Sequence, residues 1–100
     1  MNQTKKKSSA EATANPIHEK YTTLRSRMQE GTHVRNLFDY LYRNKEITPM
    51  ECFDKLNNTR ISSTVSILRH EYGVPIVMQK TTKNGRTYGV YWIDWEALNV

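Results

Sequence analysis

The residues of this sequence that most often catalyse reactions or bind metals are scattered along it. They are three histidines and a single cysteine: His18, His33, His70 and Cys52. Structural zinc needs four ligands in closely spaced pairs, and these four residues lie in separate segments without such a pair. We therefore expect no metal. Cys52 lies among the apolar residues of a predicted helix, so we interpret it as a packing residue rather than a reactive thiol.

Two neighbouring carboxylates, Glu51 and Asp54, are the remaining candidates for acid–base chemistry. Glu51 is better explained as part of a helix-capping box, and Asp54 as a solvated residue on the same helix. The four glycines form no phosphate-binding loop. We expect a protein that is not an enzyme, with no cofactor and no small-molecule substrate.

The charge pattern points instead to a polyanionic partner. The chain has 15 Lys and Arg against 10 Asp and Glu, a net charge of +5. Six basic residues lie between positions 55 and 92, and Glu71 is the only acid there. Segregation of this kind within one domain is typical of a nucleic-acid-binding face, although a merely solvated surface is the alternative.

The 100 residues support one domain with an N-terminal extension. Residues 1–15 are polar and contain Lys5, Lys6 and Lys7, so we expect a flexible basic arm. No apolar run is long enough to cross a membrane, and we expect a soluble, cytoplasmic protein. Residues 31–100 are expected to form the globular domain.

Residues 16–30 are either an amphipathic helix or a linker. Four apolar residues recur there at helical spacing: Ile17, Tyr21, Leu24 and Met28. Pro16 suits the first position of a helix. The apolar stripe is thin and needs a surface to lie on, either the globular domain or a second copy of the chain, which would make a homodimer.

Two helices are predicted next. Residues 32–44 have a wide apolar face and begin at Thr32, which can cap a helix. Thr48, Pro49 and Glu51 then predict a capping box and a helix to about Leu56. We expect that helix to bury Met50 or Cys52, together with Phe53 and Leu56.

A third helix is predicted immediately afterwards, capped by Thr59 and ending near Tyr72 before Gly73. Its inward residues are Ile61, Val65, Leu68 and Tyr72. Two helices joined by a tight turn are typical of a helix-turn-helix motif. The outward arc holds small hydroxyls and basic groups suited to a DNA groove: Arg60, Ser62, Ser63, Ser66, Arg69 and His70.

The C-terminal part predicts a β-hairpin turning at Asn84-Gly85. This turn places Lys83 opposite Arg86 and, further along, Ile76 opposite Ile93. One face should cover the helices through Ile76, Met78, Tyr91 and Ile93. Lys80, Lys83 and Arg86 should project at the tip. Trp92 is expected to pack in the core or at the sheet edge. Residues 94–98 are expected to form a terminal turn, the alternative being that Trp95 anchors another protein.

The predicted fold is therefore α+β and mainly α: a winged helix-turn-helix with a three-helix core, a β-hairpin wing and an additional N-terminal helix if residues 16–30 are helical. The stretch from Ile47 onward resembles the small winged helix-turn-helix domains of bacteriophages and prophages. The matching residues are Ile47, Thr48 and Glu51; Arg60, Ile61 and Ser62; Leu68 and Arg69; Gly73, Pro75 and Ile76; and Tyr88, Gly89 and Tyr91. The resemblance covers about residues 32–93 and implies DNA binding in the cytoplasm or nucleoid of a bacterial host.

These observations predict sequence-specific binding to double-stranded DNA, by a transcriptional regulator or an accessory to another DNA transaction. The predicted contacts are Thr59, Arg60, Ser62, Ser63, Ser66, Arg69, Lys80, Lys83, Asn84 and Arg86, with Lys5, Lys6 and Lys7 from the arm. The alternative is a protein-interaction module on the same scaffold. A single-strand binder is a third reading, if Tyr88, Val90 and Trp92 form an exposed stacking surface.

Overall fold

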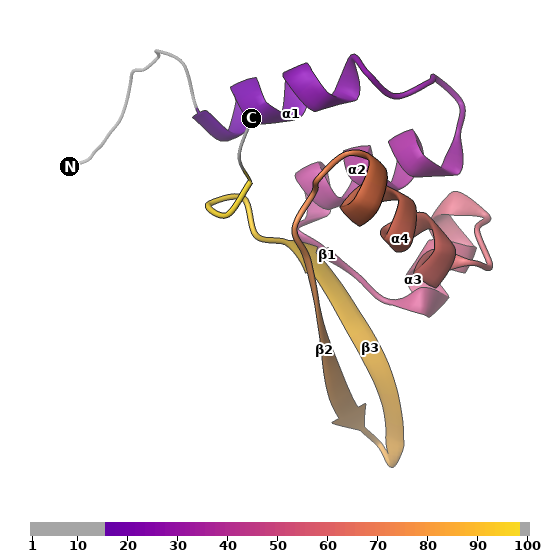
Figure 1. The fold of residues 1–100 in the computed structure, drawn as a ribbon. Coiled ribbons are helices and arrows are strands. Elements are labelled where there is room, and N and C mark those ends of the chain that lie inside the picture. Colours follow the sequence, from indigo (N-terminus) through magenta and orange to yellow (C-terminus); the bar gives the residue numbers. More distant parts are fainter. Residues whose placement is uncertain (1–15, 99–100) are drawn as a thin grey trace.

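The computed structural model of the chain describes residues 16–98. The expected basic arm, with Lys5, Lys6 and Lys7, lies outside the described residues. The described part is an α+β domain with four helices and one three-stranded antiparallel sheet. The elements are α1 (Pro16–Arg25), α2 (His33–Asn44), β1 (Glu46–Ile47), α3 (Pro49–Leu56), α4 (Ile61–Glu71), β2 (Ile76–Lys83) and β3 (Arg86–Ile93). Figure 1 shows the β2–β3 hairpin projecting from the body formed by the helices.

The core lies between the helices and the base of the sheet. Leu37, Phe38 and Leu41 of α2 are buried at its centre, as the amphipathic pattern of that segment predicts. The predicted inward face of α4 is confirmed, since Ile61, Val65 and Leu68 are buried and Tyr72 packs against the core. None of the helices within residues 16–98 has the length and apolar character of a membrane span.

The predicted capping of α2 and α3 is confirmed. The Thr32 hydroxyl accepts a hydrogen bond from the Arg35 amide at the start of α2. At α3, the Thr48 hydroxyl accepts from the Glu51 amide at 3.2 Å, and the Glu51 carboxylate accepts from the Thr48 amide at 3.0 Å. These bonds satisfy amides that have no partner inside the helix, so local sequence sets where both helices begin.

The expected burial of α3 is partly wrong. Of the alternatives Met50 and Cys52, Cys52 is the buried residue and Met50 is 64% exposed; Leu56 packs against the core as expected, but Phe53 is 49% exposed. A helix of two turns touches the core along one strip. Cys52 and Leu56, four residues apart, form that strip, whereas Met50 and Phe53 lie on a neighbouring face.

The predicted hairpin register is confirmed at every pair, from Lys83 opposite Arg86 to Ile76 opposite Ile93. Asn84 and Gly85 have φ angles of 54° and 76°, the left-handed conformation that a two-residue hairpin turn requires. A third strand, β1, pairs with β3 and was not predicted. It has only two residues, Glu46 and Ile47, too few for any alternation pattern.

Met78 is a second exception to the predicted burial. Ile76 and Ile93 are buried and Tyr91 packs against the core, but Met78 is 41% exposed. The sheet order is β1-β3-β2, so β2 is an edge strand. Tyr91, on the central strand, has a paired residue on each side, Met78 on β2 and Ile47 on β1. Met78 has a neighbouring strand on one side only and is therefore less covered.

Helix α1 packs on the same chain. The Tyr21 ring stacks on Tyr42, with ring centroids 3.8 Å apart and planes 3° apart. The Tyr21 hydroxyl and Arg25 Nε both donate to Asp39 Oδ1, at 2.6 and 2.9 Å. Burial, reinforced by the hydrogen bond to Asp39, raises the pKa of Tyr21. Leu24 is 1% exposed.

This packing shows which surface covers the apolar stripe of residues 16–28. Of the four apolar residues in this segment, Tyr21, Leu24 and Met28 are buried within the chain, so they are covered by the domain itself and not free for a second copy. Ile17 remains 39% exposed. Residues 16–28 thus belong to the packed domain, whose expected start was residue 31.

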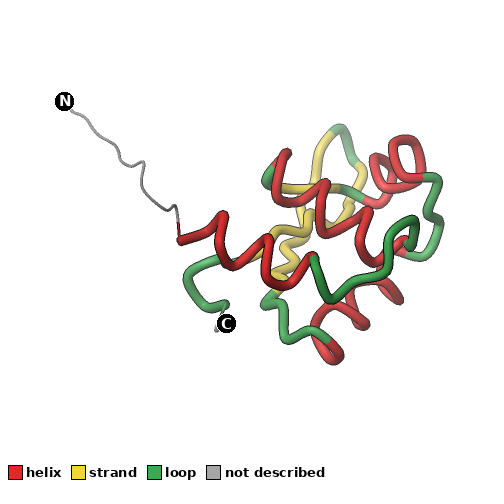
Figure 2. Tube along the Cα trace, turned by 90° about the horizontal axis from the view of Figure 1, so that it is seen from above, coloured by secondary structure: helices red, strands yellow, loops and turns green. Residues whose placement is uncertain are grey.

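The C-terminal segment closes beside α1, and Figures 1 and 2 both show the two lying side by side. Lys20 Nζ donates to the Trp95 carbonyl at 3.0 Å, and the Trp95 ring contacts Phe38 and Tyr42. The Ala97 amide donates to the Asp94 carbonyl, and Leu98 is buried. The expected terminal turn is therefore present, and Trp95 packs on α2.

Because α1 is part of the core, we predict that Leu24→Ala lowers the free energy of unfolding by about 2–5 kcal/mol. The exposed Thr23→Ala, one position earlier, should lower it by less than about 1 kcal/mol. Urea unfolding at several protein concentrations measures both. A dimer contact at Leu24 would instead make the stability rise with protein concentration, which would contradict this assignment.

Candidate nucleic-acid interface

Helix α4 begins at a polar network centred on Asn58. Asn58 is 3% exposed; its Oδ1 accepts from the Arg60 amide at 2.8 Å, and its Nδ2 donates to Thr64 Oγ1 at 2.9 Å. Thr59 was expected to cap this helix and does not: it is exposed, and Arg60 occupies the N-cap position without a side-chain cap. The side chain of Asn58 accepts a hydrogen bond from the amide two residues later, which is the Asx-turn pattern. Because Asn58 is buried and Thr59 is exposed, the bond to Asn58 is the more stable of the two alternatives.

The outer face of α4 is arranged as predicted. Ser62, Ser63 and Ser66 are exposed, as are Arg60 and His70. Thr64, Val65 and Leu68 are buried on the opposite side. The exposed face therefore presents short hydroxyl side chains, which allow close approach of the helix to another surface and can donate to or accept from it.

Arg69, predicted to contact DNA, is exposed and also forms hydrogen bonds within the chain. Its Nε and Nη2 both donate to the Ile76 carbonyl, at 3.1 and 2.7 Å. The Val74 amide also donates to the Leu68 carbonyl at 2.9 Å. These bonds join the end of α4 to the start of the edge strand β2, whose outward carbonyl would otherwise lack a partner. Arg69 thus positions the hairpin.

The distal part of the hairpin is basic and exposed. Lys80, Lys83 and Arg86 are all exposed, and β2 and β3 contain no acidic residue. Lys83 faces Arg86 across the strands, a like-charge pair that slightly destabilises an isolated hairpin. Asn84 contributes the turn conformation at the tip. Figure 1 shows this tip well beyond the helices.

Two hollows adjoin these elements and were not predicted. One of about 430 Å³ lies beside the start of α4 and is lined by Arg60, Ser63, Ile67 and residues of α2. Another of about 400 Å³ lies between the start of α3 and the hairpin and is lined by Thr48, Pro49, Met50, Arg86, Thr87 and Tyr88. The sequence did not predict these hollows, because they form between separate elements that only tertiary packing brings together.

Tyr88, Val90 and Trp92, which would have to form an exposed stacking surface in a single-strand binder, are only partly exposed.

Comparison of the chain with models of protein families, with curated proteins and with solved structures found no match.

Arg69 and Arg60 provide a matched pair for testing these assignments. We expect Arg69→Met to lower the free energy of unfolding by about 1–3 kcal/mol, because the Ile76 carbonyl loses two charge-assisted hydrogen bonds. Arg60→Met should change it by less than about 0.5 kcal/mol, since its exposed side chain, unlike that of Arg69, forms no hydrogen bond with the described residues. Thermal and urea unfolding give both values, and equal stability of the two variants would refute the positioning role of Arg69.

Proposed function

We propose that this chain is a winged helix-turn-helix protein that binds double-stranded DNA in a sequence-specific manner. The element order α2-β1-α3-α4-β2-β3 and the sheet order β1-β3-β2 are compatible with that fold. In this proposal α3 and α4 are the helix-turn-helix, with α4 as the reading helix, and the β2–β3 hairpin is the wing. The resemblance to bacteriophage and prophage domains supports a role as a transcriptional regulator or DNA-transaction accessory in a bacterial cytoplasm or nucleoid.

The observation that carries the proposal is that the same domain has a hydroxyl-bearing face on α4 and a hairpin with basic but no acidic residues. Ser62, Ser63 and Ser66 leave the helix surface low enough to enter a major groove, where hydroxyls bond base edges or phosphates. Arg60, at the start of the helix, can reach a phosphate or a guanine edge. The acid of α4, Glu71, is its last residue and lies at the other end.

The hairpin would supply affinity rather than sequence preference. Lys80, Lys83 and Arg86 extend from a rigid β-ribbon, and phosphates between Lys83 and Arg86 would relieve their mutual repulsion. Lys5, Lys6 and Lys7, outside the described residues, would add further phosphate contacts. Such contacts release counterions, so binding should weaken steeply with salt.

We predict that Lys83→Ala weakens binding to every duplex alike and lowers the slope of log K against log salt by about one. Arg86→Ala should do the same. The control is Arg27→Ala, which removes one exposed charge from the segment between α1 and α2 and should leave the slope nearly unchanged. Fluorescence anisotropy with a labelled random-sequence duplex at several salt concentrations measures this; equal slopes for Lys83→Ala and Arg27→Ala would argue against a wing–phosphate contact.

The reading helix has its own test. Selection from a random duplex library should yield a preferred sequence, and the double variant Arg60→Ala, Ser63→Ala should lose about tenfold or more of that preference. Ser26→Ala, an exposed serine outside α4, serves as the control and should keep it. Retention of the same preference by the double variant would show that α4 is not the reading helix.

A protein-interaction module is the second candidate, favoured by one observation. Met50 and Phe53 lie on one face of α3 and are 64% and 49% exposed, which is unusual for large apolar side chains three residues apart. The stripe on α1 no longer supports this reading because the domain covers it. Absence of any binding to random duplex at low salt would favour a partner protein docking on Met50 and Phe53.

A further inference from the structure

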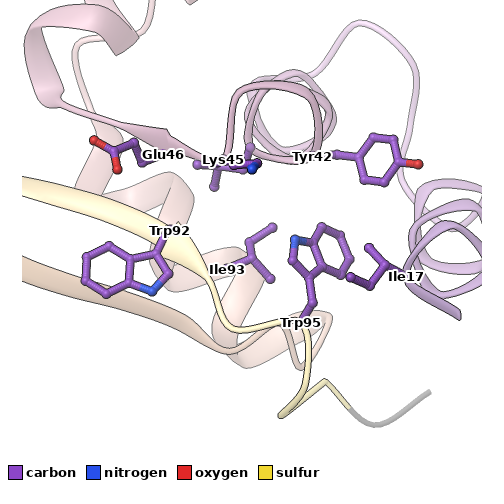
Figure 3. A pocket seen from close by; sticks show the side chains of 8 residues that line it. Ile17, Tyr42, Lys45, Glu46, Trp92, Ile93 and Trp95 are labelled. Carbon is purple, nitrogen blue, oxygen red and sulfur yellow. The ribbon is translucent and has the colours of Figure 1, made fainter. Parts of the chain in front are cut away.

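A pocket of about 500 Å³ lies where the C-terminal turn meets α1, α2 and the β1–β3 strands (Figure 3). Its lining is Ile17, Leu41, Tyr42, Lys45, Glu46, Trp92, Ile93 and Trp95. Apart from Trp92, these residues lie outside the proposed nucleic-acid interface. A volume of this size falls within the range of small-molecule sites, roughly 300–1,000 Å³.

The walls of the pocket are mostly apolar and remain partly open to water. Ile17 is 39% exposed, and both indoles, Trp92 and Trp95, are only partly buried. Figure 3 shows Ile93 between the two indoles, with Ile17 beyond Trp95. These are the only two tryptophans of the chain. Flat apolar walls of this kind favour a ligand with an aromatic or aliphatic body.

Two hydrogen-bond donors at the pocket, on the exposed Lys45 and the half-buried Trp95, have no partner within residues 16–98. Figure 3 shows the Lys45 ammonium and the Trp95 indole nitrogen on the two sides of the space next to Ile93. No bond from either nitrogen to a described residue is present; the Trp95 carbonyl, not its N–H, meets Lys20. The carboxylate of Glu46 lies at the other end, by Trp92, and forms no salt bridge with Lys45.

We propose that this pocket binds a small monocarboxylate with an apolar, preferably aromatic, body. Its carboxylate would accept from Lys45 Nζ and Trp95 Nε1, and its body would lie against Ile93 and the indoles. The nearby Glu46 carboxylate disfavours ligands of higher negative charge, such as phosphate dianions. The ligand is bound and not converted, and the proposal holds whether or not the chain binds DNA.

The experiment uses the full chain and three probes with the same body: 3-phenylpropionate, 3-phenylpropylamine and 3-phenylpropan-1-ol. Because the only tryptophans of the chain line the pocket, intrinsic fluorescence reports binding directly. We expect a saturable change with the carboxylate, at an affinity about tenfold or more above that for the amine or the alcohol.

The variant Lys45→Met keeps the apolar stem of the side chain and removes its charge. It should lower the affinity for 3-phenylpropionate about tenfold. Lys45→Arg should retain most of the affinity and confirms that the site survives substitution. Lys55→Met, an exposed lysine of α3, is the matched control and should bind as the unmodified chain does. The proposal is overturned if the carboxylate gives no saturable change, if the amine binds as tightly, or if Lys45→Met binds like Lys55→Met.

Discussion

The register of the β2–β3 hairpin constrains the rest of this domain. Asn84 and Gly85 adopt the left-handed conformation of a two-residue turn, which pairs Lys83 with Arg86 and, at the other end, Ile76 with Ile93. Because side chains alternate along a strand, a slip of one residue would turn the buried Ile76 and Ile93 toward water. The same register presents Tyr91 to Ile47 of β1, so one turn sets the core at the base of the sheet and the basic pair at its tip.

The position of this hairpin relative to α4 depends on Arg69. Its guanidinium bonds the Ile76 carbonyl twice, across a connection that contains Gly73. This exposed cation thereby links two parts of the candidate interface. The proposed division of labour is a hydroxyl-bearing helix face with Arg60 at its start for base contacts, and a basic hairpin for the phosphates.

Much of the fold could be predicted from the sequence because it is encoded within a few residues. The box of Thr48 and Glu51 and the turn at Asn84 are local signals, and both are confirmed. The prediction failed where two neighbouring residues could each cap the same helix, or where the partner of a residue is distant in the sequence. Asn58 rather than Thr59 organises the start of α4: Asn58 is buried and bonds the Arg60 amide, whereas Thr59 is exposed. The covering of α1 depends on contacts with residues 14 to 75 positions away, from Arg25 with Asp39 to Lys20 with Trp95. The role of Arg69, the two-residue strand β1 and the hollows likewise depend on tertiary packing.

The central claim is that the face of α4 and the tip of the hairpin contact one duplex together. The most direct measurement is a titration of the isotope-labelled chain with a duplex, followed by backbone amide chemical shifts. We expect the largest shifts to cluster in residues 60–66 and 80–87, in both segments at the same duplex concentration. Shifts confined to α1 and the C-terminal turn, or to the hairpin without α4, would contradict it.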